Sequence, residues 1–218
     1  MINANADAMG IIFPNNYDKF VPELVSERLM ASIPFASRYR MIDFLLSSMV
    51  GCGIDKIEVL VRENYHSLVD HLGGGREWDL SRKNGGLSIF PPFAQKSIGS
   101  MGGGRVEALA NILPVLKKQK EKYVIMADTN IAANFDFNAL IAQHVKTDAD
   151  ITFAYTKEEL PQELTGAKDA SKGLYYTLKL DGDKVEDIYI NKQEQGVQNF
   201  SMNIYIANRE WLIDTCLL

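Results

Sequence analysis

Short apolar runs alternate along the chain with longer segments whose apolar residues recur at helical spacing. The run at residues 8–13 (AMGIIF) ends at Pro14 and is typical of a buried strand that enters a turn. Similar runs predict strands over residues 56–61, 123–127 and 151–155. The segments between them predict helices over 41–52, 65–72, 105–118 and 137–145, with Pro114 kinking or shortening the third. This alternation predicts an α/β fold in which helices cover both faces of a parallel sheet.

The last third of the chain has a different pattern. Residues 175–180, 184–190 and 200–206 have the composition of strands, and the sequence Asp-Gly-Asp at 181–183 predicts a hairpin between the first two. We therefore expect a mostly parallel mixed sheet with an antiparallel addition. With 218 residues, 46% of them hydrophobic and 23% charged, the chain can bury its own core, and we assign residues 1–218 to one domain.

Charge and cysteine content narrow the possible partners and compartment. A net charge of −5 argues against nucleic acid or an anionic membrane as a partner. The chain has no apolar run near the ~20 residues that span a bilayer. Cys52 and Cys216 are too far apart in the sequence to form a metal-spaced pair, and so few cysteines favour a reducing, cytoplasmic location.

The segment from Gly73 to Gly104 holds nine of the sixteen glycines. A loop of this length is often functional, because its backbone N–H groups can wrap a ligand. A surface excursion with no binding role explains the same composition, and both interpretations stay open here.

Ligands of such folds bind where parallel strands end, so the residues after each strand are the candidates. The loop after residues 8–13 reads PNNYDKF and lacks the glycines with which a backbone cradles phosphate. Asp128 follows the strand at 123–127 and is a candidate Mg²⁺ ligand, although a lone carboxylate is a weak signal. A structural role, as the cap of the next helix, explains Asn130 as well as a role in a metal site does.

The remaining polar candidates favour structural roles. His66 and His71 are five positions apart, which is the wrong spacing for two ligands on one helix face, so we interpret them as surface or capping residues. Arg38, Arg40 and Lys56 flank the helix at 41–52, and we expect them to form a solvated rim.

Several motifs resemble those of bacterial ADP-glucose pyrophosphorylases (glucose-1-phosphate adenylyltransferases). Residues 32–44, SIPFASRYRMIDF, are similar to the family's P-A-V-x-F-G-G-K-F-R-I-I-D-F, and the block from Arg40 to Phe44 is the most specific part. His66-Ser67-Leu68 with His71 resembles H-[ST]-L-x-x-H. Residues 104–111 resemble G-T-A-D-A-V-x-x-N, and residues 201–205, SMNIY, match S-M-G-I-Y at all but one position.

The resemblance implies a Rossmann-like sugar-nucleotide transferase fold. The implied reaction joins ATP and glucose 1-phosphate into ADP-glucose and pyrophosphate with Mg²⁺, in glycogen biosynthesis. Carried over by motif, the substrate-binding positions are Arg28, Gly104, Lys192 and Ser201.

This sequence departs from the family at positions that the reaction needs. The glycine loop aligns with residues 15–20, where Lys19 is one of the substituted positions, and the lysine of R-A-K-P aligns with Met30. The metal-binding Asp of G-D-H aligns with Asn130. We therefore expect this chain to hold no metal cofactor, and Asp128 stays only a weak candidate for a metal ligand. These losses resemble the regulatory D-type subunit, which implies a catalytically silent protein that assembles with a catalytic C-type subunit.

Two other functions stay open. One is an active adenylyltransferase that uses Asp128 and Lys19 in altered geometry. The other is a sugar-phosphate sensor that binds through Lys192. The resemblance also implies that residues 1–218 are incomplete at the C-terminus, since the family's transferase domain runs further and a left-handed β-helix domain follows it.

Overall fold

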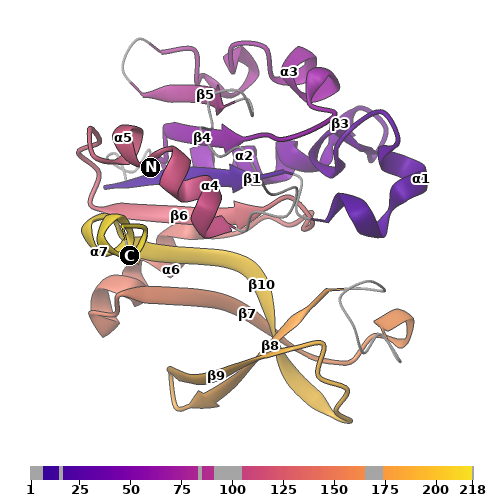
Figure 1. The fold of residues 1–218 in the computed structure, drawn as a ribbon, viewed down its shortest axis with the longest axis vertical. Helices are drawn as coiled ribbons and strands as arrows, with labels where there is room; N and C mark the ends of the chain where they lie inside the picture. Colours follow the sequence, from indigo (N-terminus) through magenta and orange to yellow (C-terminus); the bar gives the residue numbers. More distant parts are fainter. Residues whose placement is uncertain (1–6, 15–16, 83–84, 91–104, 165–173, 218) are drawn as a thin grey trace.

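A computed structural model describes residues 7–14, 17–82, 85–90, 105–164 and 174–217, and its main feature is an eight-stranded sheet (Figure 1). Four parallel strands form one half, in the order β5-β4-β1-β6. Their bounds are β1 (Ala8–Phe13), β4 (Lys56–Leu60), β5 (Gly86–Phe90) and β6 (Tyr123–Asp128).

The other half of the sheet is antiparallel. The long strand β10 (Val197–Asn208) pairs antiparallel with β6 and then with both β7 (Ile151–Glu159) and β8 (Tyr176–Asp181). Strand β9 (Lys184–Ile190) forms the predicted hairpin with β8. The mixed sheet with an antiparallel addition is therefore confirmed.

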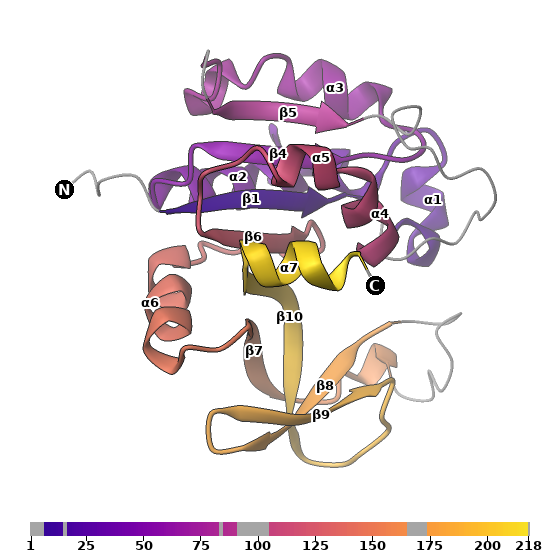
Figure 2. The same cartoon turned by 60° about the vertical axis from the view of Figure 1, so that its left-hand side comes forward.

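Successive side chains of the central strands point to opposite faces of the sheet, and because both faces are covered they form two separate cores. Ile12, Ile57 and Ile125 face α2 (Met41–Gly51), α3 (His66–Leu72) and α6 (Phe137–Thr147). Ile11, Val124 and Met126 face α4 (Arg105–Asn111), α5 (Leu113–Leu116) and α7 (Arg209–Thr215). Figure 2 shows α4, α5 and α7 in front of β1 and β6, with α2 behind them. Pro114 lies in the first turn of α5, which begins at Leu113, so the predicted helix at 105–118 is divided in two.

Several short elements lie outside the predicted pattern. They are a helix α1 (Pro22–Val25), a two-stranded ribbon of β2 (Pro34–Phe35) and β3 (Tyr39–Arg40), and 3₁₀ turns at Asp18–Phe20, Met30–Ser32, Arg76–Trp78 and Gln162–Leu164. The glycine-rich segment is not wholly a surface excursion, because β5 lies within it and pairs with β4. Residues 91–104 of that segment lie outside the described residues.

Two of the motifs that resemble those of the family contact each other between α2 and α3. The Arg40 guanidinium donates to the Ser67 carbonyl at 2.6 Å and to Ser67 Oγ at 2.8 Å. His71 Nε2 lies 2.6 Å from Asp43 Oδ1, while Asp43 Oδ2 accepts the Arg40 backbone N–H at 2.9 Å. The expectation that His71 is a surface or capping residue and that Arg40 lies on a solvated rim was therefore wrong. These side chains join two helices, so the most specific part of the resemblance has a structural role.

Lys56 was also wrongly expected on a solvated rim. Its ammonium donates to Gln119 at 2.7 Å and to Glu121 at 2.9 Å. Arg38 is exposed as expected and stacks on Tyr39. His66 is exposed too, and its ring stacks on Tyr65.

Glu58 on β4 is a buried acid, and among the described residues nothing hydrogen-bonds to its Oε2. Burial raises its pKa, so the folded state holds the proton more tightly than the unfolded chain does. Stability therefore falls as pH rises from the unfolded pKa through the folded one. We expect Glu58→Gln to raise the free energy of unfolding near pH 7 by on the order of 1 kcal/mol, with the gain shrinking toward pH ~4.

Urea unfolding of both proteins across this pH range measures the difference. Glu121→Gln is the control with the opposite sign. Burial by itself raises the pKa of Glu121, but the hydrogen bond and charge of Lys56 together with backbone hydrogen bonds outweigh burial and lower that pKa. A gain from Glu58→Gln that does not change with pH would contradict the assignment.

Among the described residues, no helix combines the length and apolar character needed to cross a membrane.

Candidate functional site

The candidate site lies where β1 and β6 end together, since Phe13 pairs with Asp128 in the sheet. Asp128 is on the face that packs against α4, and Arg105 is the first residue of that helix. The Arg105 guanidinium donates two hydrogen bonds to the Asp128 carboxylate, from Nε at 3.3 Å and from Nη2. The Asp128 side chain is 0% exposed and that of Arg105 is 26% exposed. A strand end at which phosphates and metal ions commonly bind thus holds an internal ion pair.

Aromatic rings enclose the arginine. The centre of its guanidinium lies 6.0 Å from the Phe13 ring and 5.5 Å from the Tyr205 ring, which are cation–π distances. Burial by itself lowers the pKa of Arg105, but the charge and hydrogen bonds of Asp128 outweigh burial and raise it above its usual range. Arg105 therefore stays a cation at every pH at which the fold exists.

The loop after β1 is fastened to β10 by a chain of hydrogen bonds. The Asn203 amide donates to Tyr17 Oη at 2.6 Å, and Tyr205 Oη donates to Asn203 Oδ1 at 2.9 Å. Tyr17 is 8% exposed, and its pKa is raised by burial and then by the nearby charge of Asp128. Tyr17, Asn203 and Tyr205, with Arg105 and Asp128, are called the plug below, because together they fill the strand ends with side chains of this chain.

The backbone at Asn203 explains its place in the plug. Its φ is +54°, in the left-handed region, and the pairing of β10 with β7 shifts register between Ser201 and Tyr205. Asn is one of the few residues other than glycine that adopts this conformation readily. Asn203 thus adopts a backbone conformation that favours glycine, and it places an amide where the motif S-M-G-I-Y has a glycine.

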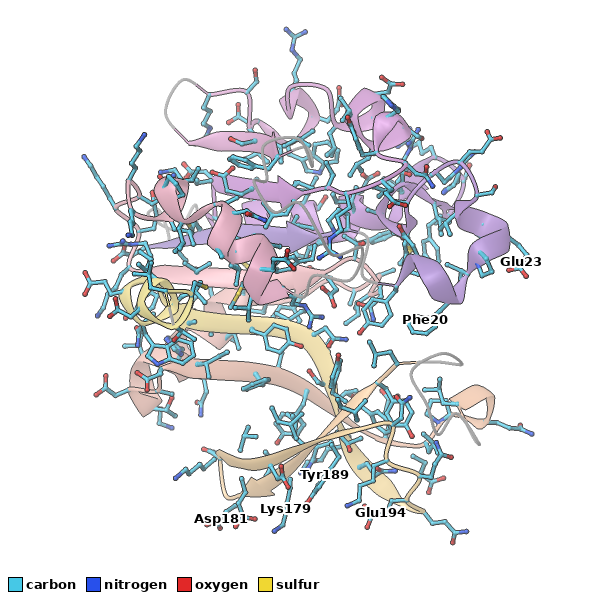
Figure 3. The ribbon with its side chains drawn as sticks, viewed as in Figure 1. Phe20, Glu23, Lys179, Asp181, Tyr189 and Glu194 are labelled. Atoms are coloured by element: carbon cyan, nitrogen blue, oxygen red, sulfur yellow. The ribbon has the colours of Figure 1, made fainter. Side chains whose placement is uncertain are left out.

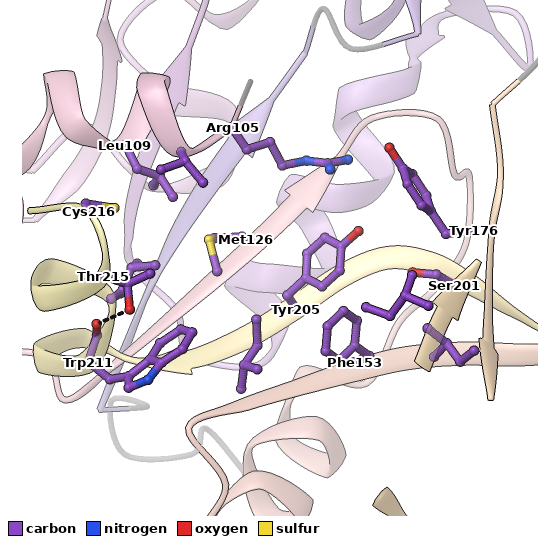
Figure 4. A pocket seen from close by; sticks show the side chains of 15 residues that line it. Arg105, Leu109, Met126, Phe153, Tyr176, Ser201, Tyr205, Trp211, Thr215 and Cys216 are labelled. Carbon is purple, nitrogen blue, oxygen red and sulfur yellow. Dashed lines mark hydrogen bonds between the residues drawn. The ribbon is translucent and has the colours of Figure 1, made fainter. Parts of the chain in front are cut away.

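A pocket of about 290 Å³ opens beside the plug, between α4, α7 and the strands β6 to β10. Figure 4 shows the Arg105 guanidinium with the Tyr176 and Tyr205 hydroxyls at one end and Trp211 at the other. Among the described lining residues, Arg105 alone carries a charge, and most of the others are apolar. The charge that this pocket offers to a ligand is thus already bound to Asp128.

The predicted substrate residues do not all converge. Ser201 lines the pocket with Arg105, whereas Arg28 lines a separate pocket near α1 together with Glu23 and Glu27. Lys192 pairs with Glu194 at 2.7 Å, and its ammonium lies 4.2 Å from the Tyr189 ring centre. Figure 3 places Tyr189 and Glu194 at the end of the β8–β9 region that is far from the parallel strands.

The remaining predicted positions are those that align with catalytic or glycine positions of the family. Met30 contributes its backbone N–H, which donates to Asp18 Oδ1 at 2.7 Å and so ties down the loop after β1. Asn130 does not cap the next helix as one interpretation had it, because Asp136 caps α6 by accepting from the Asn138 and Ala139 N–H groups. The Lys19 side chain and Gly104 lie outside the described residues.

Sequence reasoning missed four members of the plug, namely Arg105, Tyr17, Asn203 and Tyr205. Arg105 was interpreted only as the start of a helix. Asn203 offered a signal, since it departs from a motif at a glycine position. Tyr17 and Asn203 are 186 residues apart, so no local pattern pairs them.

Comparison with known proteins identifies the family and supports the fold. The sequence profile described as "Nucleotidyl transferase" matches residues 23–168. The chain belongs to the nucleotidyl transferase family. A solved structure, a putative glucose-1-phosphate thymidylyltransferase from Bacillus anthracis in complex with a sucrose, superposes with a TM-score of 0.67 at 14% identity. It covers 93% of this chain and 72% of that chain, and it supports the fold.

Named relatives fall into two groups. The glycogen biosynthesis protein GlgD of Geobacillus stearothermophilus is 36% identical over 151 residues, which is 68% of this chain and 43% of that protein. The glucose-1-phosphate adenylyltransferase of Clostridium novyi is 32% identical over 197 residues, which is 88% of this chain and 49% of that protein. The chain thus spans less than half the length of these curated relatives.

Proposed function

We propose that this protein is a regulatory, catalytically silent component of ADP-glucose synthesis in glycogen biosynthesis, which acts by assembling with a catalytic glucose-1-phosphate adenylyltransferase. The single observation that carries the proposal is the Arg105–Asp128 ion pair at the ends of β1 and β6. Nucleotidyl transfer needs open space there for phosphates and a cation. The plug fills that space with side chains of the chain itself.

The loop after β1 and the named relatives support the same conclusion. The loop after β1 has no glycine between residues 14 and 20, and Asp18 and Tyr17 tie it to Met30 and Asn203. Without glycines, side chains hinder the close approach of the loop's backbone N–H groups to a phosphate. The GlgD proteins among its relatives are named for glycogen biosynthesis, which supports the assignment to that process.

The test is an assay of ADP-glucose formation from ATP and glucose 1-phosphate with Mg²⁺. The protein alone should form no ADP-glucose. Adding it to the catalytic adenylyltransferase of the same organism should raise that enzyme's activity above its activity with an equal amount of an unrelated acidic protein.

Two results would reject the proposal. One is turnover by the protein alone that disappears in Asp128→Ala, which would favour an active adenylyltransferase. The other is an unchanged activity of the catalytic enzyme at every mixing ratio.

A further inference from the structure

The family reaction implies Mg²⁺, and the residues at the end of β6 do not fit that ion. Mg²⁺ requires about six oxygen ligands in near-ideal octahedral geometry and keeps several waters. The Asp128 carboxylate is fully buried and receives two hydrogen bonds from Arg105. Among the described residues, no three His, Cys, Asp or Glu side chains gather in an arrangement that could hold a metal.

We infer that Arg105 is a resident cation in place of the divalent ion, and that Asp128 takes up a divalent cation only when that arginine is removed. The inference deepens the proposed function, and it rests on that proposal in taking the site to be catalytically silent. It concerns which cation balances Asp128, and it does not depend on what the protein assembles with.

Three residues hold the guanidinium in place. It forms two hydrogen bonds with Asp128 and lies between the rings of Phe13 and Tyr205. Tyr205 is itself fixed by its hydrogen bond to Asn203, which also binds Tyr17. The arginine is therefore part of a connected set of side chains from α4, β6, β10 and the loop after β1.

Electrostatics makes the two cations mutually exclusive. A divalent ion bound to Asp128 would lie beside a guanidinium whose own charge is permanent. Repulsion between like charges at such short distance in a buried site is strong, because little water screens it. Removing Arg105 takes away the repulsion and leaves a buried carboxylate in need of a counter-charge.

The test is a titration of the protein with Mn²⁺, followed by electron paramagnetic resonance of the free ion. Wild type should have no saturable Mn²⁺ site that is sensitive to Asp128→Asn. Arg105→Met should gain a saturable Mn²⁺ site, and the double variant with Asp128→Asn should lose it. Arg105→Lys is the matched control, since it keeps a positive charge and should behave like wild type.

Each result decides the inference. It is overturned if wild type binds Mn²⁺ and Asp128→Asn abolishes that binding, or if folded Arg105→Met gains no binding. Should Arg105→Met fail to fold, the comparison of wild type, Asp128→Asn and Arg105→Lys still tests whether the native site excludes the ion. Failure of the proposed function would appear in the assays of ADP-glucose formation, with the protein alone or mixed with the catalytic enzyme, which are separate from this titration.

Discussion

Replacing Arg105 by methionine should lower the free energy of unfolding by about 3–5 kcal/mol, because the variant leaves the Asp128 carboxylate buried without its counter-charge. The Asp128 side chain has no solvent exposure through which water could compensate. Methionine keeps much of the length and apolar volume of the arginine stem, so the loss reports mainly on charge. Urea denaturation measures this loss, with the slope of the unfolding free energy against urea concentration the same in the variant and the wild type.

A double-mutant cycle separates the pair from its surroundings. Asp128→Asn alone leaves the guanidinium buried beside an uncharged amide and should also be destabilising. The double variant should lose less than the sum of the two single losses, with a coupling of about 0.5–3 kcal/mol. Additive losses, each below about 1 kcal/mol, would mean that the pair behaves like an exposed salt bridge and that the site is open to water.

The location of this pair shows what sequence could and could not establish about the site. Asp128 was predicted at a strand end because apolar runs reveal where strands stop, and the structure places it as the last residue of β6. Its partner could not be predicted, since Arg105 is 23 residues away in the sequence and lies on α4, which packs against the face of β6 that carries Asp128. Alternation of apolar and polar residues identifies elements, whereas a site depends on which elements their packing brings together.

The fold was more predictable than the site, because most of its elements have strong local signals. The strands β1 and β6 are nearly continuous apolar runs, as is typical of buried parallel strands, and β4 is apolar apart from Lys56 and Glu58. Strand β5 was missed because its sequence, GLSIF, begins with glycine and follows a glycine-rich stretch. Its pairing with β4 makes it a strand, and such tertiary pairing has no local signature.

Gly86 at the start of β5 is the position where a single methyl group should have the second large effect. Its φ is +87°, and a Cβ added there would lie 2.3 Å from the Leu80 carbonyl oxygen. Gly86→Ala therefore combines a strained backbone, costing about 1–2 kcal/mol, with a clash against backbone, costing about 1–3 kcal/mol. We expect a total loss of about 3 kcal/mol in the free energy of unfolding, measured by urea denaturation.

Gly182 in the β8–β9 turn is the matched control for that change. Its φ is also positive, at +58°, but a Cβ there would meet no atom within 4 Å. Gly182→Ala should therefore cost only the backbone term, about 1 kcal/mol. The difference between the two losses in the free energy of unfolding isolates the contact with Leu80. The same Leu80 carbonyl accepts a hydrogen bond from the Leu87 N–H of β5 at 3.1 Å. Equal losses at both positions would mean that the β5 edge relaxes around the added methyl group, and that this part of the glycine-rich segment is not packed as tightly as its geometry indicates.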